Sequence, residues 1–246
     1  MVTGWKNLVR LCFPIPAAML AAILALIFAT SVFGQDIVPD TIKQRVAACF
    51  ACHGKEGRAA SDGFYPRIAG KPAGYLFNQL INFQTGRRSY PLMQYMVDHQ
   101  SDAYLLEIAR YFSDQHLPYP APQASRVSEA ILARGQTLVF FGNSSRDASR
   151  YVPACVACHG QALTGTLPAI PGLLGLPQDY LNAQFGAWKS GNRRAAPPDC
   201  MAQIADRLTD GDISAAVAWL SAQAVPDQGP APLVGKLPIP CGSMPQ

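Results

Sequence analysis

The stretch Cys49-Phe50-Ala51-Cys52-His53 recurs in the second half of the chain as Cys155-Val156-Ala157-Cys158-His159. A Cys-x-x-Cys-His run is the attachment sequence of c-type haem. The two thiols each form a thioether with one vinyl group of the porphyrin, and the adjacent imidazole reaches the iron. The sequence therefore predicts two covalently bound haem c groups, attached through Cys49, Cys52, Cys155 and Cys158, with His53 and His159 as axial ligands.

Cys-x-x-Cys pairs also occur in zinc sites and in redox disulfides, which are the two alternatives. A zinc site needs two further ligands beside each pair. A thioredoxin-like motif needs a surrounding βαβ pattern, which this sequence lacks. A histidine directly after both pairs favours haem over either alternative.

Residues 1–34 have the pattern of an export signal, with Lys6 and Arg10 ahead of a long uncharged run. Small residues before Gln35 predict cleavage there to release a soluble protein. The run is also long enough for retention as a membrane anchor through residues 11–33. Both outcomes place the remaining chain in an oxidising compartment, the bacterial periplasm.

The seven cysteines leave one unassigned pair. Four belong to the haem motifs and Cys12 lies in the export segment, so Cys200 and Cys241 remain. We expect them to form a disulfide that closes a loop of about 40 residues and constrains the Pro-rich tail, worth about 3 to 4 kcal/mol in the chain-entropy model. Two separate thiols are the alternative.

The two halves match well beyond the haem motif. The segment from Pro66 to Gly86 corresponds to the segment from Pro171 to Gly191 at a constant offset of 105 residues. Farther on, Ser101-Asp102 corresponds to Thr209-Asp210 at an offset of 108 residues. Each of these pairs begins an apolar stripe with helical spacing, and Ser or Thr is a common helix N-cap. We therefore expect capped helices after Ser101 and Thr209, and further helices over residues 76–83, 130–140 and 181–188.

The offset of 108 residues also pairs Met93 with Met201, each of them eight residues before its helix cap. A single methionine is ordinarily a core gap-filler. The second half, however, has no histidine besides His159, and its only other methionine is Met244 in the tail. The repeat therefore predicts Met93 and Met201 as the sixth ligands of the two irons.

Three other side chains compete for the first iron. Met96 corresponds to Ile204, which cannot ligate iron, while His99 and His116 have no counterpart in the second half. We interpret both histidines as surface or interface residues. With both axial positions filled, no coordination site is left for a small molecule, which favours electron transfer. A dihaem peroxidase, which needs an iron with an open position, is the weakest hypothesis.

These motifs together resemble the dihaem cytochromes of the cytochrome c4 type, over roughly residues 36–225. The resemblance implies an all-α fold of tandem class I cytochrome c domains, each wrapped around one covalent haem, with the two haems facing each other across the domain interface. It also implies that the carbonyls of Pro66 and Pro171 hold the ring nitrogens of His53 and His159.

The expected organisation has five parts. They are a signal peptide or membrane anchor (1–34), a first cytochrome c domain (36–117), a Pro-rich linker (118–125), a second cytochrome c domain (126–225) and a Pro-rich tail (226–246).

We expect a dihaem electron carrier that serves the periplasmic respiratory chain, between a membrane complex or dehydrogenase and a terminal oxidase. The alternative is the cytochrome subunit of a membrane-bound dehydrogenase complex. The formal net charge of +4 gives no support for nucleic-acid binding. We interpret the basic residues as a solvated face, with pairing to haem propionates or an acidic partner as the alternative; they are Arg67, Lys71, Arg87, Arg88, Arg193 and Arg194.

Overall fold

The computed structural model describes residues 16–22, 39–60, 63–122, 124–143, 145–147 and 149–244. The chain divides into two units, Met1–Asp40 and Thr41–Gln246. Within the described part of the smaller unit, residues 17–22 form a short exposed helix. No helix in the described ranges is long and apolar enough to cross a membrane. The expected cleavage before Gln35, and most of the alternative anchor, lie outside the described residues.

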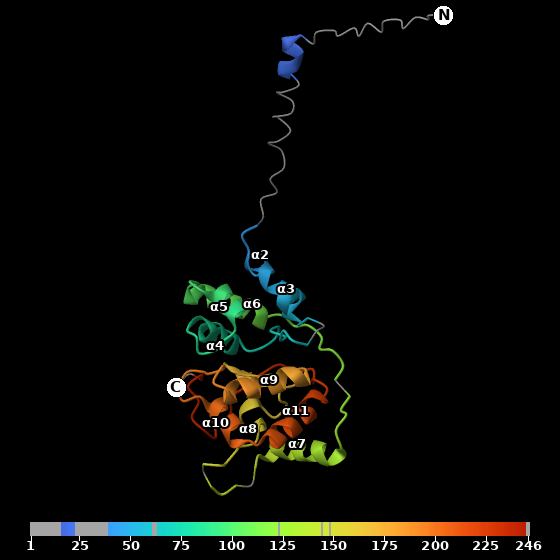
Figure 1. The fold of residues 1–246 in the computed structure, drawn as a ribbon, viewed down its shortest axis with the longest axis vertical. Coiled ribbons are helices and arrows are strands. Elements are labelled where there is room, and N and C mark those ends of the chain that lie inside the picture. The colour runs from blue at the N-terminus through green and yellow to red at the C-terminus, as the bar shows by residue number, and fades with distance from the viewer. Residues whose placement is uncertain are drawn as a thin grey trace, which may run out of the picture. The chain divides into compact units, whose positions relative to one another are not determined.

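The first half of the larger unit is a small group of helices (Figure 1). Helix α4 packs against both α5 and α6. The predicted cap of α6 is confirmed, because the Ser101 hydroxyl accepts a hydrogen bond from the Tyr104 amide. The elements here are α2 (Ile42–Arg45), η1 (Ala47–Cys49), α3 (Phe50–His53), η2 (Lys55–Gly57), α4 (Ala73–Gln84), α5 (Pro91–Val97) and α6 (Asp102–Ser113).

The second half repeats this arrangement with a longer first helix and a larger core. Helix α11 packs against α7 and α9, and α10 packs against α9 (Figure 1). Thr209 caps α11 as predicted, because its hydroxyl oxygen accepts a hydrogen bond from the Asp212 amide at 3.1 Å. The helices are α7 (Glu129–Phe141), α8 (Val156–His159), α9 (Gln178–Lys189), α10 (Cys200–Arg207) and α11 (Asp210–Ser221).

A small three-stranded sheet accompanies the helices of the second half. Strand β1 (Gly165–Leu167) pairs antiparallel with β2 (Ile170–Pro171) and parallel with β3 (Ala231–Pro232). The sequence did not predict this sheet, because strands of two or three residues are too short to show an alternating pattern. Strand β3 joins the tail to the segment that follows the second haem motif.

Two tethers fix the linker and the tail. The Arg67 guanidinium donates to the carbonyls of Leu117 and Pro118, and it stacks on the Tyr119 ring at 3.9 Å. The predicted disulfide is confirmed, since Cys200 and Cys241 are bonded with their Cα atoms 4.9 Å apart. The linker is therefore held to the first half, and the tail is held to the first residue of α10.

The contact between α7 and α11 depends on a glycine. A Cβ atom at Gly135 would overlap the backbone of Ala215 and approach the Trp219 Cβ to 2.9 Å. Both are part of α11, so only glycine lets the two helices cross at this separation. Gly186, on the exposed side of α9, serves as a control, because a Cβ atom there would have no neighbouring atom within 4 Å.

We expect Gly135→Ala to lower the free energy of unfolding by about 1 to 3 kcal/mol, because the added methyl group overpacks the helix contact. Gly186→Ala should instead raise it by about 0.5 to 1 kcal/mol, because alanine is the better helix former. Denaturant unfolding of the holoprotein measures both. Equal effects of the two substitutions would contradict this account of the contact.

Candidate functional site

The two haem-motif histidines are buried and oriented in the same way. His53 ends α3 and His159 ends α8, and they are 9% and 6% exposed. The Nδ1 atom of His53 lies 2.9 Å from the Pro66 carbonyl oxygen, and that of His159 lies 2.7 Å from the Pro171 carbonyl oxygen. Both expected hydrogen bonds are confirmed. Donation from Nδ1 leaves the Nε2 lone pair available to a metal.

Burial also controls the protonation of these residues. It lowers the pKa of both imidazoles, which favours the neutral form that binds iron. It raises the pKa of the Cys155 thiol to about 11 and moves that of Cys49 in the same direction. A zinc site requires thiolates. Among the described residues, no group of three or more His, Cys, Asp or Glu side chains is placed to hold a metal ion.

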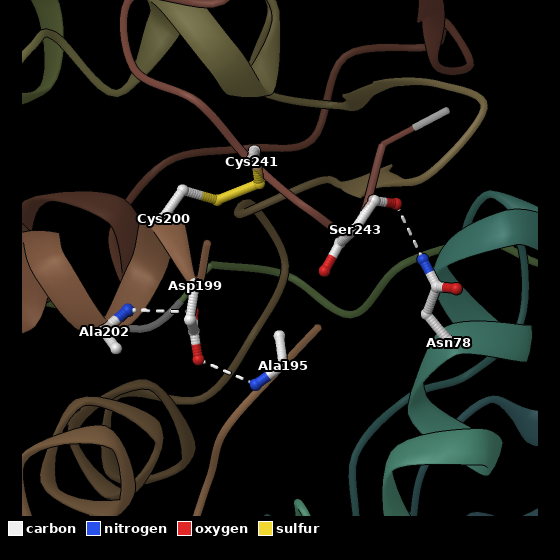
Figure 2. Close-up of a disulfide and its surroundings, with 7 residues drawn as sticks. All are labelled: Asn78, Ala195, Asp199, Cys200, Ala202, Cys241 and Ser243. Atoms are coloured by element: carbon white, nitrogen blue, oxygen red, sulfur yellow. Dashed lines mark hydrogen bonds between the residues drawn. A yellow bond between two sulfur atoms is a disulfide. The ribbon is translucent and has the colours of Figure 1, made fainter. Parts of the chain in front are cut away.

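In the second half, the predicted ligands line one cavity. His159, Cys158 and Met201 all contribute to its wall. Met201 is held in the first turn of α10, where the Asp199 carboxylate caps the helix by accepting from the Ala202 amide at 3.1 Å (Figure 2). The other carboxylate oxygen of Asp199 accepts from the Ala195 amide at 2.7 Å. The Asp199 carboxylate thus holds the first turn of α10, which carries Met201, to the segment that precedes it.

In the first half, Met93 lies on α5 and is partly buried. It packs against the apolar cluster of Phe83, Val97 and Leu105. Phe77 of α4 contacts this cluster and also the apolar cluster beside Cys49. Helix α4 therefore links the packing around Met93 with the packing around the haem motif.

The side chains that compete with Met93 are all exposed. Met96 is 44% exposed, and the His99 side chain is 93% exposed. His116 is exposed as well. The surface interpretation of the two histidines therefore agrees with the structure.

The two repeats meet through copies of the same segment. Arg88 and Arg193, which correspond at the offset of 105, form an antiparallel backbone bridge. On either side of it, the Ser89 amide donates to the Asn192 carbonyl at 2.7 Å and the Arg194 amide donates to the Arg87 carbonyl at 2.8 Å. The interface thus has an approximate two-fold symmetry that follows from the repeat.

Two glutamines hold the paired guanidinium groups together. Arg88 donates to the side-chain oxygens of Gln79 and Gln184, at 2.9 Å each. Arg193 donates to the same two oxygens at 3.2 and 2.6 Å, and to the Tyr75 hydroxyl at 3.2 Å. Each glutamine therefore binds both arginines, one from each repeat.

Comparison with known proteins identifies the family. No protein-family model matches the chain. The thiosulfate dehydrogenase electron acceptor of Thiomonas intermedia (strain K12) is 36% identical, over 72% of this chain and 79% of that protein. The protein of the same name from Stutzerimonas stutzeri (strain A1501) is 34% identical over 84% of this chain and 93% of its own length. Cytochrome c4 of Thiocapsa roseopersicina is 30% identical over 70% of this chain and 85% of its own length.

The chain belongs to the dihaem cytochrome c4 family. The crystal structure of reduced cytochrome c4 from Pseudomonas stutzeri superposes with a TM-score of 0.62 at 28% identity, covering 74% of this chain and 97% of that one. The thiosulfate dehydrogenase TsdBA of Marichromatium purpuratum also superposes with a TM-score of 0.62, at 29% identity. The match covers 72% of this chain but only 36% of that one. The predicted fold is confirmed as tandem class I cytochrome c domains, mostly helical.

As a cytochrome c4-type protein, the chain carries two covalent haem c groups and transfers electrons. The interface is suited to the carboxylates of these groups. Lys71, Arg88 and Arg193 form no ion pair with any carboxylate of the described residues. The Trp188 indole nitrogen is also buried without a hydrogen-bond partner in that part of the chain. Buried cations and an unused donor are the groups that haem propionates would satisfy.

The interpretation of the basic residues as a solvated face is wrong for three of the six. Arg67, Lys71 and Arg193 are only 3%, 7% and 6% exposed, while Arg194 is exposed. Arg67 and Arg193 contact neutral polar groups and aromatic rings, several of them distant in sequence, and composition does not reveal such contacts. The sequence did hold one signal of these contacts: arginine occurs at both 88 and 193, and glutamine at both 79 and 184, at the same offset of 105 residues.

We expect Arg193→Lys to lower the free energy of unfolding by about 1 to 3 kcal/mol, because an ammonium cannot replace the three hydrogen bonds of the guanidinium group. The adjacent Arg194→Lys is the matched control, and it should change stability by less than about 0.5 kcal/mol. Denaturant unfolding of the holoprotein compares the two. A neutral Arg193→Lys would show that these bonds do not hold the interface.

Proposed function

We propose that Cys49 and Cys52 attach one haem c, and that Cys155 and Cys158 attach the other. The spacing within each motif and the partial burial of all four thiols support this assignment. The domain boundaries at residues 36–117 and 126–225 are part of the same proposal. Each segment then contains one attachment motif and one methionine in register.

The axial ligands in this proposal are His53 with Met93 and His159 with Met201. The second pair is supported by the cavity that both side chains line. The first pair rests on the repeat register and on the packing of Met93 beside α4. A thioether opposite an imidazole shifts the haem potential upward relative to two imidazoles.

When bound, each haem supplies an iron that gains or loses one electron. The protein residues orient and insulate it. The carbonyls of Pro66 and Pro171 fix the imidazole rings through the short Nδ1 hydrogen bonds. The guanidinium groups of Arg193, which is buried, and Arg88, which is partly buried, would neutralise propionates where the repeats meet. Both haems thereby have a fixed place on one chain, which favours electron transfer between them.

The physiological role in this proposal is periplasmic electron transport from a dehydrogenase towards a terminal oxidase of the respiratory chain. Two relatives are named as electron acceptors of thiosulfate dehydrogenase. We therefore infer that a thiosulfate-oxidising dehydrogenase is the donor. Because a dehydrogenase withdraws electrons in pairs, two one-electron centres on a single chain can take up both.

A second candidate is a permanent subunit of a dehydrogenase complex. It is favoured by the match to TsdBA, in which the region similar to this chain is 36% of a longer thiosulfate dehydrogenase chain. Purification of the native protein separates the candidates, since a carrier is recovered alone and a subunit is recovered with a catalytic partner.

We expect Met93→Ala and Met201→Ala each to remove half of the far-red absorption band that marks a bond between methionine sulfur and ferric iron. The double variant should lack the band. Met96→Ala is the matched control on α5, and it should retain the full band. Persistence of the full band in both single variants would overturn the ligand assignment.

Electron acceptance is tested with purified thiosulfate dehydrogenase from Thiomonas intermedia. We expect catalytic amounts of this enzyme plus thiosulfate to reduce both haems of the oxidised protein, followed through the visible bands of ferrous haem. The electron acceptor from the same organism is the positive control, and omission of the enzyme is the negative one. Reduction of the positive control alone would refute the proposed donor.

A further inference from the structure

The tail beyond residue 226 returns to the second haem site. Strand β3 pairs with β1, and the chain then runs to Cys241, where the disulfide joins it to Cys200 (Figure 2). Cys200 directly precedes Met201. The covalent bond therefore ties the tail to the first turn of the helix that carries the proposed iron ligand.

Tail residues form part of the cavity wall. The cavity lined by His159 and Met201 is also lined by five residues of the tail, namely Leu237, Ile239, Cys241, Ser243 and Met244. Met244 is 9% exposed and packs with Ala169, Ile170 and Cys158, a cysteine of the haem motif. The partly buried tail thus lines the same cavity as the proposed ligands of the second haem, with Met244 as its buried residue.

The fit between tail and cavity is close. The Gly242 amide donates to the Pro198 carbonyl at 2.9 Å, and a Cβ atom at Gly242 would overlap the Pro197 backbone. The next residue connects to the first repeat, because the Asn78 side-chain amide donates to the Ser243 carbonyl at 2.8 Å (Figure 2). The tail therefore contacts the loop before Met201 on one side and helix α4 on the other.

In the described part of the chain, the apolar clusters around the first haem site include no residue of the tail. The residue of α5 that corresponds to Cys200 is Leu92, which is 57% exposed. After α6, the first repeat continues into the linker, which Arg67 holds. The tail is therefore an asymmetric addition to the two repeats.

We propose that residues 237–244 form one wall of the second haem pocket. Met244 closes the cavity, and the Cys200–Cys241 disulfide positions Met201. This inference rests on the proposed ligation by Met201. Met244 acts here by packing and not as a ligand. A wall that excludes water disfavours the more highly charged ferric state and so raises the potential of the enclosed haem.

The test uses Met93→Ala as the parent, because the remaining far-red band then reports the second haem alone. In this background, Met244→Ser should weaken the band, and the Cys200→Ala/Cys241→Ala double variant should do the same. In the otherwise native protein, both changes should lower one of the two haem potentials and leave the other unchanged. They should also let about one haem per chain bind carbon monoxide, against none in the native ferrous form.

Two controls distinguish packing of the wall from ligation by Met244 and from a general effect of polar substitution. Met244→Leu keeps the apolar volume and should behave as its parent, and Leu92→Ser at the equivalent exposed position of α5 should affect neither haem. Asn78→Ala is a milder change that should weaken the second-haem band, even where the disulfide variant fails to fold.

Three results would overturn the proposal. One is an unchanged second haem in Met244→Ser, in the disulfide variant and in Asn78→Ala. Another is an equal effect on both haems. The third is loss of the band in Met244→Leu, which would make Met244 the ligand. Failure of the underlying ligand assignment is distinct, since Met201→Ala in the Met93→Ala parent would then keep the remaining band.

Discussion

The two repeats pack around buried positive charge, which must be neutralised for the interface to be stable. Lys71 and Arg193 are almost fully buried, and Arg88 bonds to the same glutamines as Arg193. Burial lowers the pKa of Lys71, and the charges of Arg67 and Arg193 lower it further. A buried cation without an anion is costly. Haem propionates would supply the missing charge, so we infer that cofactor and interface stabilise each other.

The repeat accounts for the symmetry, and single residues account for its exceptions. Arg88 and Arg193 stack in the same manner on equivalent rings, Phe83 at 4.6 Å and Trp188 at 4.0 Å. Lys71, by contrast, corresponds to Leu176 in the second repeat, and the disulfide-bound tail lines the cavity of the second site. Two haems with the same attachment chemistry therefore have different surroundings, which is how one chain can give its two centres different potentials.

Local signals were sufficient to predict most of the fold and the two haem c groups. The Cys-x-x-Cys-His spacing is a covalent requirement of haem attachment, and the caps at Ser101 and Thr209 are formed within a single helical turn. The Nδ1 bonds to Pro66 and Pro171 followed from the family resemblance. The short sheet, the burial of Arg67 and the entry of Met244 into the second cavity were not predicted. Each depends on contacts between segments far apart in the sequence.

A crystal structure of the haem-loaded protein would show whether propionates neutralise the charge between the repeats. We expect propionate oxygens of the two haems to accept hydrogen bonds from Arg88 and Arg193, with Lys71 close enough to share their charge. Propionates directed into solvent, with the two guanidinium groups bonded only to glutamine and tyrosine, would contradict it.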